Sequence, residues 1–430
     1  MTILSTVLVA ILLIWLIYRL PFFRLEALPR WASPLLFFVK LCFGFALWAV
    51  YTFYYTDRST ADIYKFYDDA RYIHQAWQKD KTAFAGLMLG SEDTTLHHYT
   101  LPMKNWERNF NRSVPFNENR LMIRLNGLVM TVAGDNIYMT VLFFCCLSFI
   151  GCILLLKAFQ YFISEEKRQW ILLTMLFPSF LFWTSGGLKE SVIMLAIGTL
   201  LYGFLFLKAR GILAWILFAV GFLLLLTIKY FLLLCLLPSL ASYYFWIQKQ
   251  DFKAMAIKYV GVLIVSLIVV IAIAPLDKRV DFARIVSKKQ KHAVYEAQYM
   301  NVGSYSDVPV VEPTIASVMS GLPVGLWNSL MKPYLWQSRN PMMLISAIEN
   351  LVLLLFLIVA MVYRDKKSKL NLNLIFFLLI AVLLYYALIG LLTPVLGNLV
   401  RYRVVLLPVV IFSGLTIANA FPPIADKQDK

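Results

Sequence analysis

Long apolar runs constrain this chain more than any other feature of its sequence. A transmembrane helix needs about 20 consecutive apolar residues to cross a hydrocarbon core of about 30 Å. Eleven windows meet that requirement, at about 2–19, 34–55, 137–157, 169–185, 190–207, 211–228, 230–247, 257–275, 341–363, 371–393 and 402–420. A chain that is 60% hydrophobic and 15% charged cannot bury so much apolar surface in a water-soluble globule. We therefore expect an all-α polytopic membrane protein with about eleven (10–12) transmembrane helices.

Basic residues in the short loops predict how the chain is oriented. With eleven spans, the short loops that carry Lys and Arg all fall on one side, namely 157–168, 208–210, 249–258 and 364–369. Positive loops favour the cytoplasmic side. The first window is followed by Arg19, Arg24 and Arg30, and it lacks a cleavage site of the signal-peptide type, so we expect it to be retained. The prediction is a multi-pass protein of the inner (plasma) membrane, with its N-terminus outside and its C-terminus cytoplasmic.

Two long extracytoplasmic loops, 56–136 and 276–340, follow from this topology, and they interrupt what we expect to be a single transmembrane domain over 1–430. Within the first loop, apolar residues of 61–78 recur at steps of three and four, which predicts an amphipathic helix. Such a helix is expected to lie along the membrane surface. The basic residues of both loops point to anionic lipid or to a substrate that carries phosphate.

Three carboxylates stand on this predicted amphipathic helix. Asp62 and Asp69 are seven residues apart and share a helix face, whereas Asp68 is rotated from Asp69 by about 100°. If two of them act together, the pair is Asp62 and Asp69, and Asp68 is expected to be a dispensable, solvated residue. A competing interpretation makes Asp62 simply the N-cap of the helix.

Cationic residues mark three further candidate binding positions. "LFPSFLFWTSGGLKESVIML" puts Lys189 and Glu190 where a helix begins, which suits an anion but is also typical of a tight turn with Lys189 reaching the headgroups. "TPVLGNLVRYRVVLLP" puts Arg401 and Arg403 before the last helix, as ligands for a lipid phosphate or as headgroup anchors. "NENRLMIRLNG" supplies Arg124, for which the same two roles are open.

Two of these segments resemble a known superfamily. "RYRVVLLPVV" is similar to a pattern near the end of bacterial GT-C glycosyltransferases, which are polytopic enzymes that use polyprenyl-phosphate sugars as donors. The order of parts also resembles that superfamily, with an aspartate just after an early span and then a first outer loop. "FPSFLFWTSGGLKES" resembles a segment of bacterial envelope-polysaccharide proteins, among them glycosyltransferases and polysaccharide polymerases.

The resemblance implies a GT-C-like integral membrane glycosyltransferase that moves a sugar from a polyprenyl-phosphate-linked donor to an acceptor on the outer face of the membrane. It implies a carboxylate base, Asp62 first and Asp69 second, and cations that stabilise the leaving phosphate, for which Lys189, Arg401 and Arg403 are the candidates. The aspartate pair could instead hold a divalent cation, as in some members, so metal dependence is open. The sugar, the acceptor and the oligomeric state are open as well.

Two alternative functions remain from the sequence. One is an O-antigen or exopolysaccharide polymerase-like protein acting on a lipid-linked oligosaccharide. The other is a lipid or polysaccharide transporter or flippase, although several windows contain no ionisable residue, which disfavours coupling to ions. All three expect membrane lipids as partners and no nucleic acid.

Overall fold

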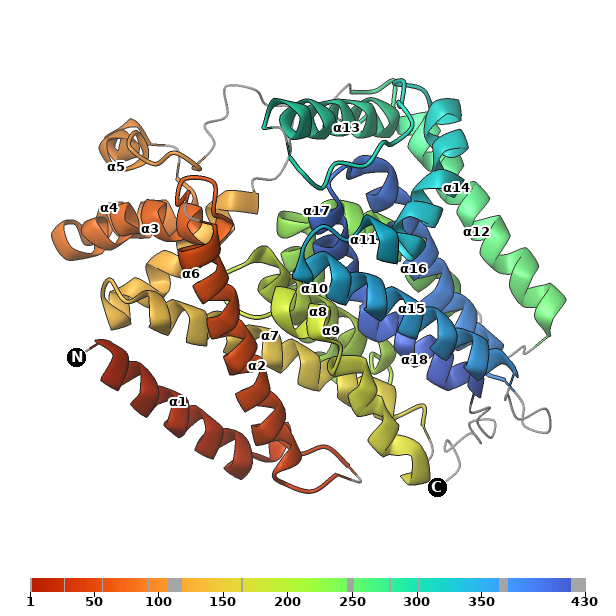
Figure 1. The fold of residues 1–430 in the computed structure, drawn as a ribbon, viewed down its shortest axis with the longest axis horizontal. Helices are drawn as coiled ribbons and strands as arrows, with labels where there is room; N and C mark the ends of the chain where they lie inside the picture. The colour runs from red at the N-terminus through yellow and green to blue at the C-terminus, as the bar shows by residue number, and fades with distance from the viewer. Residues whose placement is uncertain are drawn as a thin grey trace. The chain divides into compact units, whose positions relative to one another are not determined.

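In the computed structural model, the regular secondary structure of the described residues is helical, apart from an antiparallel bridge between Tyr305 and Val395. The structure describes residues 2–26, 28–55, 57–91, 93–106, 118–163, 165–245, 251–277, 280–300, 302–362 and 370–418. The α-helices are α1 (Thr2–Arg19), α2 (Ala32–Ala49), α3 (Asp62–Lys79), α4 (Lys81–Leu89), α5 (His97–Thr100), α6 (Glu118–Ala133), α7 (Ile137–Gln160), α8 (Pro178–Trp183), α9 (Lys189–Leu205), α10 (Gly211–Ile228), α11 (Tyr230–Phe245), α12 (Phe252–Ile273), α13 (Phe282–Tyr299), α14 (Ile315–Met331), α15 (Pro341–Val362), α16 (Leu372–Leu392), α17 (Leu396–Arg403) and α18 (Leu407–Ala418) (Figure 1).

Eight helical segments in the described ranges are long and apolar enough to cross a membrane. They are Thr2–Arg19, Ala32–Tyr54, Ile137–Gln160, Gly211–Ile228, Phe252–Ile273, Pro341–Val362, Leu372–Leu392 and Leu396–Ala418. Each coincides with one of the expected windows, so the chain is a polytopic membrane protein, as the apolar runs predict.

Three of the eleven expected windows are not among these eight long segments. The window 169–185 is divided between a 3₁₀ helix, Glu165–Met175, and the six-residue α8, because Pro178 restricts the residue before it and begins a new helix. The windows 190–207 and 230–247 form α9 and α11, of 17 and 16 residues. The basic loop 364–369 lies outside the described residues.

The chain divides into two compact units. The first comprises Met1–Ala158 and Leu181–Tyr230, and within it α9 packs on α10 and α3 packs on α6. The second comprises Phe159–Phe180 and Phe231–Lys430, and within it α14 packs on α16 while α15 and α16 both contact α18. The predicted catalytic aspartates and Lys189 therefore belong to one unit, and Arg401 and Arg403 to the other.

Glycines bring helix backbones into direct contact within both units. A Cβ atom on Gly198 of α9 would lie 2.1 Å from the backbone oxygen of Gly151 on α7. In the second unit, a Cβ atom on Gly390 of α16 would lie 1.9 Å from the backbone oxygen of Gly325 on α14. No larger side chain fits at these crossings, which is the small-residue packing typical of membrane helices.

The predicted amphipathic helix of the first loop is confirmed as α3. Its buried residues include Ile63, Phe66, Ala70 and Ile73, at the spacing that the sequence shows. The side chain of Ile73 packs directly over Gly127 of α6. The apolar face of α3 is therefore covered by protein at these residues, and the position of the helix along the membrane surface stays a prediction.

Candidate functional site

The turn formed by residues 184–188, between α8 and α9, is the centre of the candidate site in the first unit. Gly186 has a φ of +83°, a left-handed conformation that glycine adopts without steric cost. The Ser191 hydroxyl bridges the turn, with its Oγ 3.1 Å from the Thr184 carbonyl oxygen and 2.7 Å from that of Gly186. The "TSGGLKES" segment thus folds into a turn closed by the first residues of α9.

The amino terminus of α3 packs against this turn. A Cβ atom on Gly187 would lie 3.1 Å from the side chain of Ile63, so the Ile63 side chain packs directly on the backbone of the turn. The ammonium group of Lys189 lies 5.3 Å from the centre of the Phe66 ring, one helical turn further along α3. Asp62 directly precedes Ile63. Two segments that the sequence marks separately, around Asp62 and around Lys189, are therefore neighbours in the first unit.

Asp62 is the first residue of α3. Ala61 is the N-cap and makes no side-chain capping hydrogen bond, so the interpretation of Asp62 as the N-cap is wrong. The carboxylate of Asp62 is 3.5 Å from the Lys65 ammonium, and its side chain is 31% exposed. A carboxylate in the first helical turn is stabilised by the helix dipole.

Lys189 lies between α3 and α6. Its Nζ atom is 3.2 Å from Oε1 of Glu118, the first residue of α6, and its side chain is only 16% exposed. The neighbouring Glu190 is buried inside the unit, at 1% exposure. Lys189 is therefore held by protein groups at a partly open position, whereas Glu190 faces inward.

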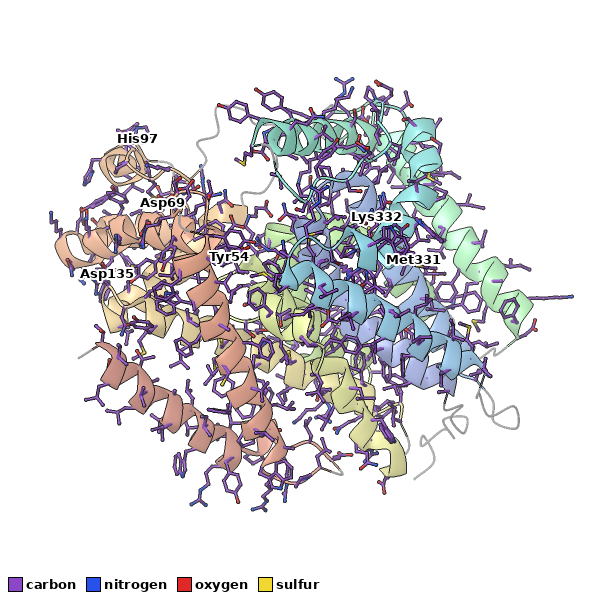
Figure 2. The ribbon with its side chains drawn as sticks, in the orientation of Figure 1. Tyr54, Asp69, His97, Asp135, Met331 and Lys332 are labelled. Carbon is purple, nitrogen blue, oxygen red and sulfur yellow. The ribbon has the colours of Figure 1, made fainter. Side chains whose placement is uncertain are left out.

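Asp69 has a different environment from Asp62. Asp69 lies on α3 (Figure 2) and is 4% exposed. Its two carboxylate oxygens accept hydrogen bonds from the backbone N–H groups of Lys104, at 3.0 Å, and Asn105, at 2.6 Å. Burial raises the pKa of the Asp69 carboxyl above its ordinary value, although these two hydrogen bonds oppose the rise. Through these two hydrogen bonds, Asp69 links the backbone of residues 104 and 105 to α3.

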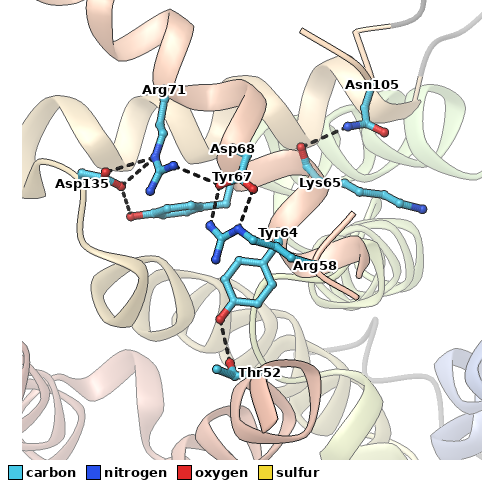
Figure 3. A network of polar contacts seen from close by, with 9 residues as sticks. All are labelled: Thr52, Arg58, Tyr64, Lys65, Tyr67, Asp68, Arg71, Asn105 and Asp135. Carbon is cyan, nitrogen blue, oxygen red and sulfur yellow. Dashed lines mark hydrogen bonds and ion pairs between the residues drawn. The ribbon is translucent and has the colours of Figure 1, made fainter. Parts of the chain in front are cut away.

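Asp68 belongs to a network of charged side chains that Figure 3 shows. Its two carboxylate oxygens accept hydrogen bonds from Arg58, at 2.9 and 2.6 Å, and lie near Arg71 at 3.4 Å. Arg71 also pairs with Asp135 at 3.0 Å, and Asp135 accepts the Tyr67 hydroxyl at 2.5 Å. The Asp68 side chain is 35% exposed, as expected of a partly solvated residue, and its ion pairs also tie the residues before α3 to the helix.

Arg124 has its main contacts within the protein. Its Nε donates to the carbonyl oxygen of Leu87 at 2.8 Å, and its guanidinium lies 5.2 Å from the Trp106 ring centre. Arg120 lies 5.3 Å from the same ring. Burial lowers the pKa of Arg124 from its ordinary value. The two arginines hold Trp106 and the end of α4 beside α6, a role that neither sequence interpretation included.

Arg401 and Arg403 are both buried in the second unit. Nη1 of Arg403 donates to the carbonyl oxygens of Ser329, at 3.0 Å, and Lys332, at 2.9 Å, at the carboxyl end of α14. A cation at a helix carboxyl terminus satisfies carbonyls that the helix leaves open. The carbonyl oxygen of Arg403 in turn accepts the Tyr386 hydroxyl at 3.0 Å. Arg403 is thus a packing residue of this unit.

Two ionisable residues inside candidate spans were missed from the sequence. Lys40 of α2 is 2% exposed, and its Nζ donates to the Thr184 hydroxyl at 2.8 Å. Glu349 of α15 is also buried, and its Oε1 accepts the backbone N–H of Ser179 at 2.7 Å. The sequence does show each of them as a single charged residue inside an apolar window. A charged residue there is costly in a membrane and usually has a functional role.

Among the described residues, no three His, Cys, Asp or Glu side chains form a group that could hold a metal ion. The divalent cation that the resemblance allows is therefore still an open alternative. Comparison of the chain with protein-family models, curated proteins and solved structures found no match.

Proposed function

We propose that the protein is an integral membrane glycosyltransferase that uses a polyprenyl-phosphate-linked sugar as donor. The supporting observation is that the α3 amino terminus packs on the 184–188 turn: Ile63, the residue after Asp62, lies against Gly187, and Phe66 lies near the Lys189 ammonium. A base and a cation are the two groups that such a transfer needs. The proposal includes a site on the outer face of the plasma membrane.

In the proposed reaction, an acceptor hydroxyl oxygen attacks the anomeric carbon of the sugar, and the bond from that carbon to the phosphate oxygen breaks. Asp62 takes the hydroxyl proton, and the polyprenyl phosphate leaves with its added negative charge near Lys189. Asp69, Arg124 and Arg403 have no role in this step, because their polar atoms bind backbone carbonyl or N–H groups. Arg401 is buried in the other unit and is left out as well.

The test is sugar transfer in proteoliposomes that contain the purified protein, a lipid-linked acceptor and a panel of radiolabelled polyprenyl-phosphate hexoses. Asp62→Asn is expected to lower transfer by about 10²–10⁴-fold, the usual contribution of a general base. The matched control is Asp93→Asn, an exposed N-cap at which asparagine also caps well. Full activity of Asp62→Asn, or transfer from no member of the panel, would contradict the proposal.

A transporter is the second candidate, and Lys40 and Glu349 favour it. Buried ionisable residues in spans often mark the path of a substrate or proton. The Oε2 atom of Glu349 is buried and has no hydrogen-bond partner within the part of the chain that the structure describes. Proteoliposomes with a fluorescent polyprenyl-phosphate sugar separate the two functions: a transporter moves the intact lipid between leaflets, whereas a transferase consumes it.

A further inference from the structure

Lys40 is a lysine inside a helix that is otherwise apolar. It belongs to the candidate span Ala32–Tyr54, and 2% of it is exposed. An ammonium group at such a position costs several kcal/mol unless polar groups receive it, so a lysine persists there only for a specific role. Its Nζ donates a hydrogen bond of 2.8 Å to Oγ1 of Thr184, the first residue of the 184–188 turn.

The backbone of α2 runs close beneath this turn. A Cβ atom on Gly44, one helical turn after Lys40, would lie 3.5 Å from the backbone nitrogen of Gly186. A Cβ atom on Gly186 would lie 3.2 Å from the side chain of Leu47. The apolar contacts limit how closely the turn can approach α2. The hydrogen bond from Lys40 adds a directional contact between the turn and α2.

The turn is thereby held from two directions. Thr184 is bound through its side chain by Lys40 and through its carbonyl oxygen by Ser191 of α9. Lys189 follows the turn directly as the first residue of α9. A shift of the turn would therefore move the Lys189 ammonium away from Phe66 and from the α3 amino terminus.

We infer that Lys40 is a positioning residue that, through its hydrogen bond to Thr184, fixes the 184–188 turn and so sets where Lys189 stands beside α3. The effect on catalysis rests on the proposed function, whereas the effect on the position of Lys189 does not. A methionine at position 40 would fill similar space but would leave the Thr184 hydroxyl without this donor.

The position of Lys189 is measured first, without reference to any reaction. Cysteine is introduced as Lys189→Cys, and the rate of its modification by a charged, membrane-impermeant thiosulfonate is recorded after subtracting the rate of the protein without it. Thr184→Val, which removes the hydroxyl and keeps the shape, is expected to change this rate by about fivefold, as is Lys40→Met, since an ordinary hydrogen bond is lost. Thr184→Ser keeps the hydroxyl and should retain the original rate.

Transfer is measured second, in the protein that retains Lys189. Thr184→Val and Lys40→Met should lower kcat by about fivefold with little change in the KM for the donor, and Thr184→Ser should restore kcat. Unchanged modification rates in Thr184→Val would overturn the inference, even if Lys40→Met fails to fold. Altered modification rates without any sugar transfer in the unmodified protein would instead support the positioning role and contradict the proposed function.

Discussion

The carboxylate of Glu118 lies 3.2 Å from the ammonium of Lys189, so a group predicted to bind phosphate has an acidic partner on another helix. Glu118 reduces the positive charge that Lys189 can offer to an anion. Glu118→Gln should therefore tighten the binding of a short-chain polyprenyl phosphate by about two- to fivefold, the range of a partly exposed ion pair. The measurement is titration calorimetry in detergent at low and high salt, because screening should shrink the effect.

Glu312 supplies the control for this titration. Its carboxylate lies 3.5 Å from Lys291 in an exposed pair of the second unit, so Glu312→Gln makes the same chemical change elsewhere. Equal effects of the two substitutions would mean that general charge, and not the neighbourhood of Lys189, governs binding.

Asp69 is predicted to act on stability and not on the chemical step. Asp69→Asn leaves one oxygen where two accept the backbone N–H groups of Lys104 and Asn105, which should cost about 1–3 kcal/mol. Thermal unfolding in detergent is the measurement, followed by transfer assays below the unfolding temperature. Loss of transfer with unchanged stability would return Asp69 to the catalytic role that the sequence suggested.

The stability of the α3 network should depend on pH through Asp135. Burial alone would raise its pKa, but the hydrogen bonds from Tyr67 and Arg71 outweigh burial and lower the pKa from its ordinary value of 3.8. A carboxyl whose pKa is lower in the folded state stabilises the protein above the unfolded value, and that contribution is lost as the pH falls through the folded value. The unfolding temperature of the native protein should therefore drop more steeply below about pH 4 than that of Asp135→Asn. Parallel curves for the two proteins would contradict this.

Periodicity and hydropathy were sufficient to predict much of this fold. The eight long apolar segments and the amphipathic α3 are local properties, so the order of residues alone reveals them. The same reasoning missed the break in the window 169–185, because it could not weigh Pro178 against the apolar residues around it. It also singled out Asp62 and Lys189 without showing that they are neighbours.

Contacts between distant residues could not be predicted in this way. Lys40 and Thr184 are 144 positions apart, and only the folded unit shows that Lys40 donates a hydrogen bond to Thr184. Likewise, a basic residue at a helix end has the same sequence signature whether it meets lipid phosphate or backbone carbonyls. Arg124 and Arg403 both proved to bind carbonyls.

The crossing of α7 and α9 should tolerate no residue larger than glycine at position 198. Gly198→Ala introduces a methyl group 2.1 Å from the Gly151 backbone oxygen, which forces the helices apart and should cost about 1–3 kcal/mol or more. Gly261→Ala on α12 is the matched control, because a Cβ atom there meets nothing within 4 Å. The control should be neutral or slightly stabilising, by up to about 1 kcal/mol, since alanine favours a helix. Unfolding in mixed micelles measures both, and equal effects would argue against the close crossing.

Arg403 should be required for the stability of the second unit because one guanidinium nitrogen bridges two carbonyl oxygens at the end of α14. Arg403→Lys keeps the charge but loses the planar fork, so we expect a loss of about 1–3 kcal/mol in the free energy of unfolding. Arg339→Lys is the control, since Arg339 also donates to a carbonyl, that of Gly303 at 3.0 Å, but is exposed, and should change stability by less than about 0.5 kcal/mol. If Arg403→Lys keeps full stability but weakens binding of a short-chain polyprenyl phosphate, Arg403 is a ligand-binding residue and its packing role is secondary.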